Sequence, residues 1–232
     1  MACAAPEASF GQELAAAGRA KPHSRRETMA DLPLGVLTAT IWTYWFCVGF
    51  MIVRIRRKSR KLVGLVPEQT LERYMWVVWV PLVFLWAALP WLAQRHAAGV
   101  LALPEFARGG GIYGAVRIAA ALVALACLVQ TIRCWIRMGS AWRMEASRDN
   151  TTLITDGLFG RIRHPIYAYS VLLMLCSVVI LPSLPMVMIA AVHVLLMNLK
   201  ARNEERHLLQ SHGEAYARYL ARTGRFFPRL GR

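Results

Sequence analysis

Two short charged segments contain the residues whose types and spacing could do chemistry. The first, GRIRHPIYAYS at 160–170, sets arginines and a histidine against a proline between two apolar stretches, and the second, KARNEERH at 200–207, follows another apolar stretch. Charged groups are costly near a membrane, so such clusters are candidates for a functional site. Histidine and carboxylate side chains can hold polar ligands or move protons, and a lysine can hold an anion.

Helical periodicity places polar residues of the second segment on one face. At about 100° per residue, His193, Lys200 and Glu204 fall within one narrow stripe, whereas Glu205 lies well off it. A solvated helix end with an ordinary Lys200–Glu204 pair explains part of this pattern. His193, however, lies inside an apolar run, where a polar side chain usually faces the protein interior or a cavity. We therefore interpret the stripe as the wall of a polar pocket.

The proline of the first segment predicts the start of a helix. Pro165 disfavours the helical conformation at His164 and suits the first turn of the apolar run that follows. A helix start with interfacial arginines explains this segment equally well. Both charged segments, however, flank the same pair of apolar runs, so we expect them to be neighbours at one end of a helical hairpin.

The composition is that of a membrane protein. Of the 232 residues, 56% are hydrophobic and 18% are charged, and the mean hydropathy is +0.38. This is too apolar for an ordinary soluble domain. The net charge of +15 comes from basic blocks between apolar runs, a pattern that argues against nucleic-acid binding. The five cysteines show neither metal-ligand spacing nor a disulfide framework, so we expect no metal site.

Five apolar runs predict an all-α fold, an integral membrane helical bundle of about five transmembrane helices. The runs are residues 32–53, 74–93, 113–132, 166–181 and 185–199. The first three have the length needed to cross a hydrocarbon core of roughly 30 Å. The last two are short and are separated by the proline-rich break LPSLP, so they are expected to form a tight hairpin.

The basic residues alternate between the two sides of this bundle. They are concentrated after the first and third runs and in the C-terminal tail, whereas only Arg95 and Arg108 lie between the second and third runs. By the positive-inside rule, we expect the two charged segments and the C-terminus in the cytoplasm and the N-terminus outside. The basic residues of the N-terminal tail fit this orientation less well.

Several motifs of the C-terminal part occur in a recognisable order. The chain has TTLITDGLFGRIRHPIY, then a proline-broken hairpin, then NEERHLLQSHGEAYARYLARTGRFFP. This arrangement resembles the isoprenylcysteine carboxyl methyltransferase family and its bacterial relatives, in which L-V-T-x-G-x-Y-x-x-x-R-H-P-x-Y precedes E-E, G-x-x-Y-x-x-Y and R-F-x-P. The resemblance spans residues 138–228. It implies an integral membrane methyltransferase that uses S-adenosyl-L-methionine and has no Rossmann domain.

The resemblance also implies which residues meet each ligand. The cofactor would contact Thr152, Leu153, Ile154, Phe159, His164, Pro165, Ile166, Tyr167 and Glu204. On the substrate side, the basic residue of the family aligns with Lys200, to which the helical stripe adds His193. Lys200, Glu204 and His164 are the candidate catalytic residues. The chain departs from the family at Tyr169, where glycine is common, and this tyrosine could narrow a lipid groove.

The expected reaction is methyl transfer from S-adenosyl-L-methionine to a lipophilic acceptor. Among the possible acceptors we favour a carboxylate, such as that of a prenylated cysteine. A carboxylate is already ionised at neutral pH, so positioning and water exclusion suffice, whereas an amine or thiol would need a general base. A phospholipid or small-molecule N-methyltransferase is one alternative. An NADPH-dependent membrane sterol reductase, which shares R-H-P-x-Y, is another, and a non-catalytic membrane scaffold is a third.

Composition, the apolar runs and the resemblance together divide the chain into three parts. Residues 1–31 are a disordered or interfacial N-terminal tail, residues 32–137 hold transmembrane helices one to three, and residues 138–232 form the methyltransferase core with its hairpin and cytoplasmic tail. We expect a multi-pass protein of a bacterial inner membrane, and make no prediction of its oligomeric state. The end of the chain is expected to fold back as a lid over the cofactor. The lid comprises Tyr216, Tyr219, Arg225, Phe226, Phe227 and Pro228.

Overall fold

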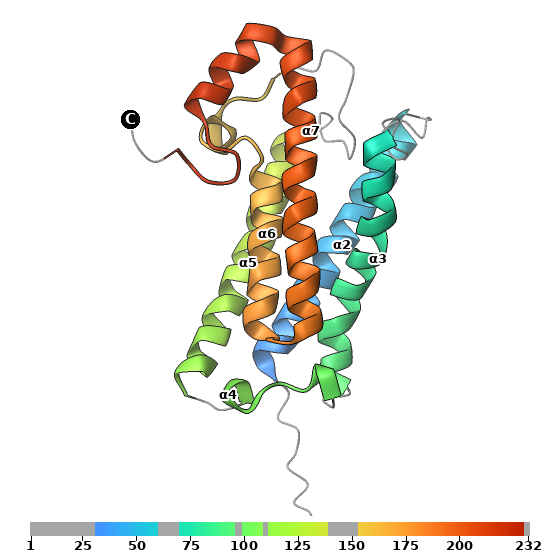
Figure 1. Ribbon diagram of the computed structural model, residues 1–232, viewed down its shortest axis with the longest axis vertical. Helices are drawn as coiled ribbons and strands as arrows, with labels where there is room; N and C mark the ends of the chain where they lie inside the picture. The colour runs from blue at the N-terminus through green and yellow to red at the C-terminus, as the bar shows by residue number, and fades with distance from the viewer. Residues whose placement is uncertain (1–30, 60–69, 96–98, 109–110, 139–152, 230–232) are drawn as a thin grey trace, which may run out of the picture. The chain divides into compact units, whose positions relative to one another are not determined.

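The structure, a computed structural model, describes residues 31–59, 70–95, 99–108, 111–138 and 153–229. From Leu32 onward these residues belong to one compact unit built from helices (Figure 1). Its elements are α2 (Leu32–Ser59), α3 (Thr70–Arg95), η1 (Gly99–Leu101), α4 (Glu105–Arg108), α5 (Ile112–Met138), η3 (Gly157–Gly160), α6 (Pro165–Ile180) and α7 (Leu184–Arg222). Within the described ranges the only β-type pairing is an isolated bridge between Ile162 and Gly224. The predicted all-α fold class is confirmed.

Each of the five predicted apolar runs lies in a helix. The helices α2, α3, α5 and α7 are long and apolar enough to cross a membrane. Helix α6 has 16 residues, which gives about 24 Å at roughly 1.5 Å per residue and falls short of a hydrocarbon core of roughly 30 Å. The part of the chain that the structure describes therefore has four helices of spanning length and one shorter apolar helix. Of the two runs expected to be short, only the first forms a short helix.

The outer faces of the helices are apolar. Phe46 on α2 is 75% exposed, and Val77 and Phe84 on α3 are 72% and 70% exposed. Large apolar side chains on this scale are unfavourable in water but suit contact with lipid tails. Together with the spanning helices, they make the chain an integral membrane protein.

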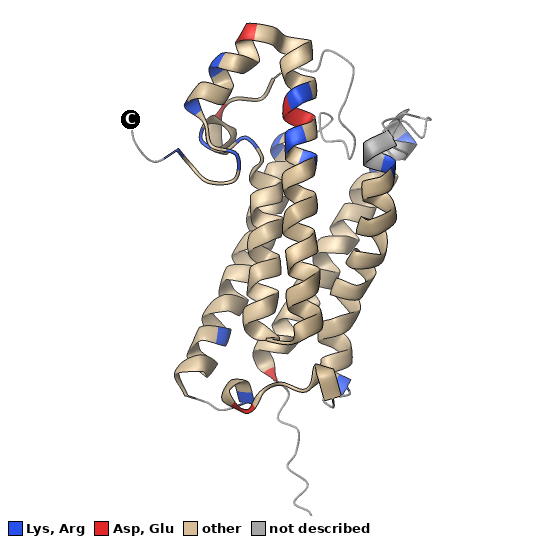
Figure 2. Ribbon diagram, viewed as in Figure 1, with Lys and Arg blue, Asp and Glu red and all other residues tan. Residues whose placement is uncertain are grey.

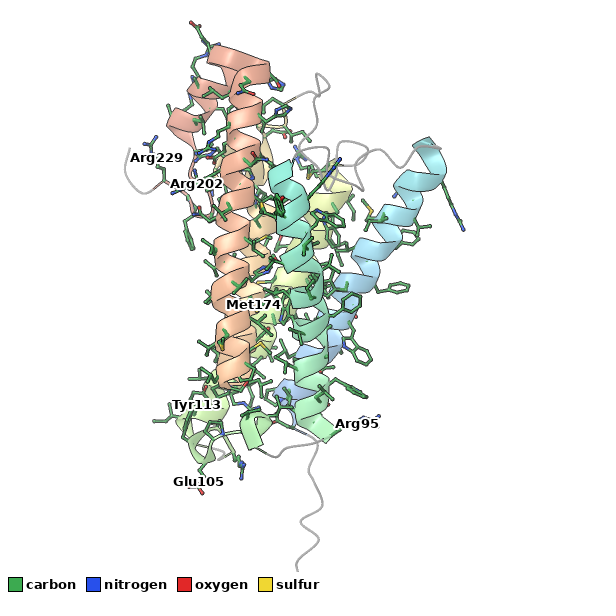
Figure 3. The ribbon with its side chains drawn as sticks, turned by 45° about the vertical axis from the view of Figure 1, so that its right-hand side comes forward. Arg95, Glu105, Tyr113, Met174, Arg202 and Arg229 are labelled. Carbon is green, nitrogen blue, oxygen red and sulfur yellow. The ribbon has the colours of Figure 1, made fainter. Side chains whose placement is uncertain are left out.

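Helix α6 lies at the centre of the packing. It contacts α2, α5 and α7, and α7 in turn contacts α3. Met174 on α6 is fully buried among the helices (Figure 3). Trp86 on α3 reaches across the core, where its Nε1 donates a hydrogen bond to Ser177 Oγ on α6 at 3.0 Å. Helix α6 is thus held among the other long helices and packs directly against α7.

The LPSLP segment forms the predicted tight turn between α6 and α7. Ser183 precedes α7, and Pro185 sits in the first turn of that helix, where a missing backbone N–H costs nothing. Helix α7 then continues well beyond residue 199, where the predicted apolar run ended. The helical conformation is interrupted at Gly213, whose φ is 51° and ψ is −126°. The chain beyond Gly213 turns back toward the loop that precedes α6 (Figure 1).

Basic side chains gather at the end of the bundle where α6 begins and α7 leaves its apolar part (Figure 2). Few charged groups lie at the other end, Arg95 and Arg108 among them. Arg117, a charged residue inside the third apolar run, is buried in α5, and its Nε donates to the carbonyl of Ile180 at 3.0 Å. Its charge is therefore held by the backbone at the end of α6 rather than exposed to lipid.

We predict that Gly213→Ala lowers the thermal unfolding temperature, because an L-residue is strained at this φ and ψ by about 1–3 kcal/mol. No atom lies within 4 Å of an added Cβ, so the effect would come from the backbone alone. Gly49→Ala is the matched control: it also adds a Cβ in open space, but inside the regular helix α2. Equal unfolding temperatures for the two variants in detergent would contradict the role given to Gly213.

Candidate active site

A histidine lies between two consecutive glutamates where α6 begins. The Nδ1 of His164 is 3.4 Å from Glu204 Oε2, and its Nε2 is 3.4 Å from Glu205 Oε1. His164 immediately precedes α6 with φ −121° and ψ 64°, the non-helical conformation expected before Pro165. The imidazole is 8% exposed and stacks on Tyr167, with ring planes 3° apart and centroids 5.4 Å apart. The histidine is thus held in a defined position between two carboxylates.

These carboxylates set the protonation of His164. Burial opposes the charged imidazole, but hydrogen bonding to Glu204 and Glu205 and their negative charges outweigh it, so the pKa of His164 is raised above its ordinary value. Protonation is therefore more favourable in the folded protein than for an ordinary histidine, and the stability that it contributes is lost as pH rises through the raised pKa. A cation between two anions offsets their mutual repulsion.

Glu204 joins three of the residues predicted from the sequence. The hydroxyl of Tyr167 donates to Glu204 Oε1, and Lys200 Nζ lies 3.8 Å from the same oxygen. The side chains of Lys200 and Glu204 are 14% and 19% exposed. Together with His164, these residues form one polar group at the end of the apolar bundle. The expectation that the two charged segments are neighbours is confirmed.

Glu205 is the centre of a second set of contacts. Its Oε1 accepts from Arg163 Nε at 2.9 Å, and its Oε2 accepts from Arg225 Nη2 at 2.5 Å. Arg225 Nη1 also donates to Asn198 Oδ1 at 3.0 Å. The helical stripe predicted from the sequence did not include Glu205. Its side chain is nevertheless more buried than that of Glu204. The signal that could have found it is the local charge pattern, a glutamate pair in a chain whose flanking segments are rich in arginine.

The C-terminal segment pairs with the loop before α6 through its backbone. Arg163 N donates to Gly224 O at 2.8 Å, and His164 N donates to Arg225 O at 3.1 Å. A Cβ on Gly224 would lie 1.7 Å from the carbonyl oxygen of Phe227, so only glycine fits this close approach. The pairing places the end of the chain against His164 itself.

Aromatic residues of the predicted lid lie against the same loop. Tyr219 donates to the carbonyl of Phe159 at 2.6 Å. Phe226 packs edge-on to the His164 ring, with centroids 6.4 Å apart, whereas Phe227 is 75% exposed. The end of the chain folds back as expected. That it closes over a cofactor remains a prediction.

Of the remaining residues predicted from the sequence, those that the structure describes are half-buried or buried. Thr152 lies outside the described residues. The loop before η3 holds Leu153 and Ile154 half-buried, and Phe159 and Pro165 are buried. His193 is fully buried and separate from the group around Glu204, and its Nε2 lies 3.0 Å from Ser170 Oγ.

A cavity opens from this polar group into the apolar bundle. Tyr167 and Lys200 line it, and so does Ile166. Its remaining wall is mostly apolar and aromatic and comes from α2, α3, α5, α6 and α7, with indoles of Trp45 on α2 and Trp79 on α3. No motif marked α2 or α3 as part of a site. A cation and a carboxylate therefore stand where a polar region meets an apolar cavity.

Comparison with known proteins finds a family match for the segment that contains these residues. Residues 121–210 match the model of the isoprenylcysteine carboxyl methyltransferase (ICMT) family. The matched segment includes His164, Tyr167, Lys200 and both glutamates. No curated protein matches the chain. The resemblance drawn from the motifs is confirmed over this segment, and the ICMT family implies a membrane methyltransferase.

We predict that Glu205→Gln lowers the thermal unfolding temperature more than Glu204→Gln does. The first change leaves Arg163 and Arg225 facing a neutral amide, and breaking a buried ion pair costs on the order of 3 kcal/mol. The second removes a charge that is held by a single lysine, a tyrosine and His164. Differential scanning fluorimetry in detergent measures both, and equal shifts would contradict the central role of Glu205.

Proposed function

Because residues 121–210 carry the ICMT family domain, we propose that the protein transfers the methyl group of S-adenosyl-L-methionine to a lipophilic carboxylate, for example a prenylated cysteine. The observation that carries this proposal is the position of Lys200. Its ammonium group lies beside Glu204 at one side and lines the apolar cavity at the other. A charged cofactor and a membrane-soluble acceptor could therefore meet at this residue.

The chemistry of the side chains around Glu204 fits the cofactor. Glu204 offers carboxylate oxygens to the amino or ribose donors of S-adenosyl-L-methionine. The aromatic faces of Tyr167 and Phe159 suit a sulfonium, which a ring face attracts as it does other cations. Leu153, Ile154 and, from the family pattern, Thr152 would complete the cofactor site. When bound, S-adenosyl-L-methionine supplies an electrophilic methyl group.

To react, a carboxylate acceptor mainly has to be oriented by the protein. A carboxylate has no proton to lose at neutral pH, so the chain has to hold it in line with the methyl group and exclude water. Lys200 would attract and orient the carboxylate, and the apolar walls of the cavity would exclude water. His164 would position Glu204 and Tyr167 rather than act as a base. His193 lies behind Ser170, which lines the cavity, and would act on the acceptor through that hydroxyl.

The distribution of charge supports an orientation in the membrane. The site lies at the end of the bundle where basic residues gather, and basic segments generally remain on the cytoplasmic side (Figure 2). We infer that the site and the C-terminus face the cytoplasm, in a bacterial inner membrane. The cofactor would then enter from the cytoplasm and the acceptor from the bilayer.

The aromatic wall of the cavity favours one alternative acceptor. Rings such as those of Trp45 and Trp79 attract ammonium groups, which suits a phospholipid or small-molecule amine. Lys200 repels such a cation and attracts a carboxylate, and we therefore prefer the carboxylate. The two acceptors differ in pH dependence, because only the amine has to lose a proton before it reacts.

We predict that Lys200→Met lowers kcat/KM for a lipophilic carboxylate by roughly 10- to 100-fold, the loss expected when a charge-assisted contact is removed. The affinity for S-adenosylhomocysteine should stay nearly unchanged. The assay is transfer of labelled methyl groups to a panel of lipophilic carboxylates, amines and thiols by the purified protein, and the rate on the carboxylate should stay flat from about pH 6 to 8.

Arg202→Met is the matched control for this experiment. Arg202 lies two positions further along α7 on an exposed face, so its loss should leave kcat/KM within about 2-fold (Figure 3). Methylation of amines but not acids, with a rate that climbs steeply with pH, would reject the carboxylate assignment.

A further inference from the structure

The cavity beside Lys200 is short along the bundle. Four helices line it, each with residues that are at most one helical turn apart: α2 within 44–48, α3 within 75–79, α6 within 166–170 and α7 within 196–200. Such a stretch of helix rises by about 6 Å at roughly 1.5 Å per residue. Trp135 of α5 lies in the same wall. The lining therefore occupies about one turn of the bundle, near the end where basic side chains gather (Figure 2).

The helices close together beyond this turn. The residues one turn further into the bundle on α2, α3, α6 and α7 are buried: Ile41, Leu82, Met174 and His193. The ring of Trp86 lies 5.4 Å from that of His193 and is itself fully buried. Tightly packed side chains thus form the floor of the cavity, and they leave no space for a ligand to extend along the bundle axis.

Much of the wall above this floor is aromatic. Of the described residues that line the cavity, six have aromatic side chains: Tyr44, Trp45, Trp76, Trp79, Trp135 and Tyr167. We call these six residues the aromatic wall. The ring of Trp79 lies 6.0 Å from Trp76 and 5.4 Å from Trp45. Tyr44 continues the contacts, 5.2 Å from Trp45 and 5.5 Å from Trp135. Rings from α2, α3 and α5 therefore form one continuous surface.

Anchoring at the membrane surface does not account for the aromatic wall. Aromatic side chains commonly collect at that surface, where they face lipid. Phe46 on α2 and Phe84 on α3 do face outward, whereas Tyr44 and Trp135 are buried. Trp79 is half-buried and packs against the same core. The aromatic wall is thus packed inside the bundle, around the cavity.

Such a wall favours an aromatic ligand over a saturated one of similar size. Each edge-to-face or offset ring contact raises affinity by roughly 2- to 12-fold beyond the burial of apolar area. The ammonium of Lys200, which lines the same cavity, attracts a carboxylate. Because the lining extends over about 6 Å of the bundle, a carboxylate at Lys200 and a ring against the wall can be separated only by a short linker.

We propose that the acceptor is a compact aromatic carboxylate, whose ring system packs against the aromatic wall and is joined to the carboxylate by a short linker. This inference rests on the proposed function, since it takes the cavity to be the acceptor site. It narrows the lipophilic carboxylates to ring acids, in preference to acids with a long chain such as a prenyl group. A long chain held beside Lys200 would meet the buried floor and would have to leave sideways between the helices.

The probes are naphthylacetate, its saturated counterpart decahydronaphthylacetate and the linear acid dodecanoate, which share the same number of carbon atoms and the same charge. Titration calorimetry measures their affinity for the purified full-length protein in detergent with no cofactor added, and the heats of titration into detergent alone are subtracted. We expect naphthylacetate to bind roughly 5- to 30-fold tighter than either other acid. A preference below about 2-fold over either acid, or no binding of naphthylacetate, would overturn the inference.

A substitution in the aromatic wall locates the preference. Trp79→Leu removes one ring and keeps an apolar side chain, so the preference for naphthylacetate over decahydronaphthylacetate should fall by at least about 2-fold. Decahydronaphthylacetate itself should bind this variant within about 3-fold of the wild-type affinity, which shows that the cavity is intact.

Phe84→Leu is the matched control for this substitution. It also replaces a ring of α3 by leucine, but Phe84 faces outward and does not line the cavity, so the preference should be retained. An unchanged preference in Trp79→Leu, or an equal loss in Phe84→Leu, would show that the aromatic wall does not hold the ring.

The experiment separates this inference from the proposed function, because binding is measured without methyl transfer. A preference for the aromatic acid in a protein that methylates no carboxylate would reject the methyltransferase assignment and support the aromatic-acid site. Methylation of long-chain acids, with no preference for naphthylacetate in binding, would support the assignment and reject the inference.

Discussion

The ion pairs of Glu205 with Arg163 and Arg225 hold the site together. They join α7 to the loop before α6, 42 positions earlier in the sequence, and to the C-terminal segment that follows α7. Glu205 is nearly buried, so these contacts exclude most water and both arginines depend on its charge. The backbone pairing of Gly224 with Arg163 and the position of His164 follow from this arrangement.

The neighbouring glutamates have different roles because successive residues on a helix are about 100° apart. Glu205 faces the arginines, which leaves Glu204 directed at Tyr167 and Lys200. His164 contacts both carboxylates and couples the two sets. One helix turn thus provides both the support for the site and the group that, in our proposal, contacts the cofactor.

The sequence predicted those features that depend on a local pattern of residues along the chain. Hydropathy located the helices, and periodicity placed Lys200 and Glu204 together. The glutamate pair and the arginine-rich flanks are visible in the sequence, but which arginines pair with Glu205 was not predictable, because Arg163 and Arg225 lie in segments that have no helical period. The wall formed by Trp45 and Trp79 depends on how α2 and α3 pack against distant helices, and no local pattern encodes that packing. The turn at Gly213 was missed because a helical pattern continues on both sides of it.

Cofactor binding tests the central claim most directly, since the methyltransferase assignment requires a site beside Glu204 for S-adenosyl-L-methionine. Titration calorimetry of the purified protein with S-adenosylhomocysteine should give saturable binding with one site per chain, and NADPH should give none. Saturable binding of NADPH with no heat from S-adenosylhomocysteine would contradict the account and favour a reductase.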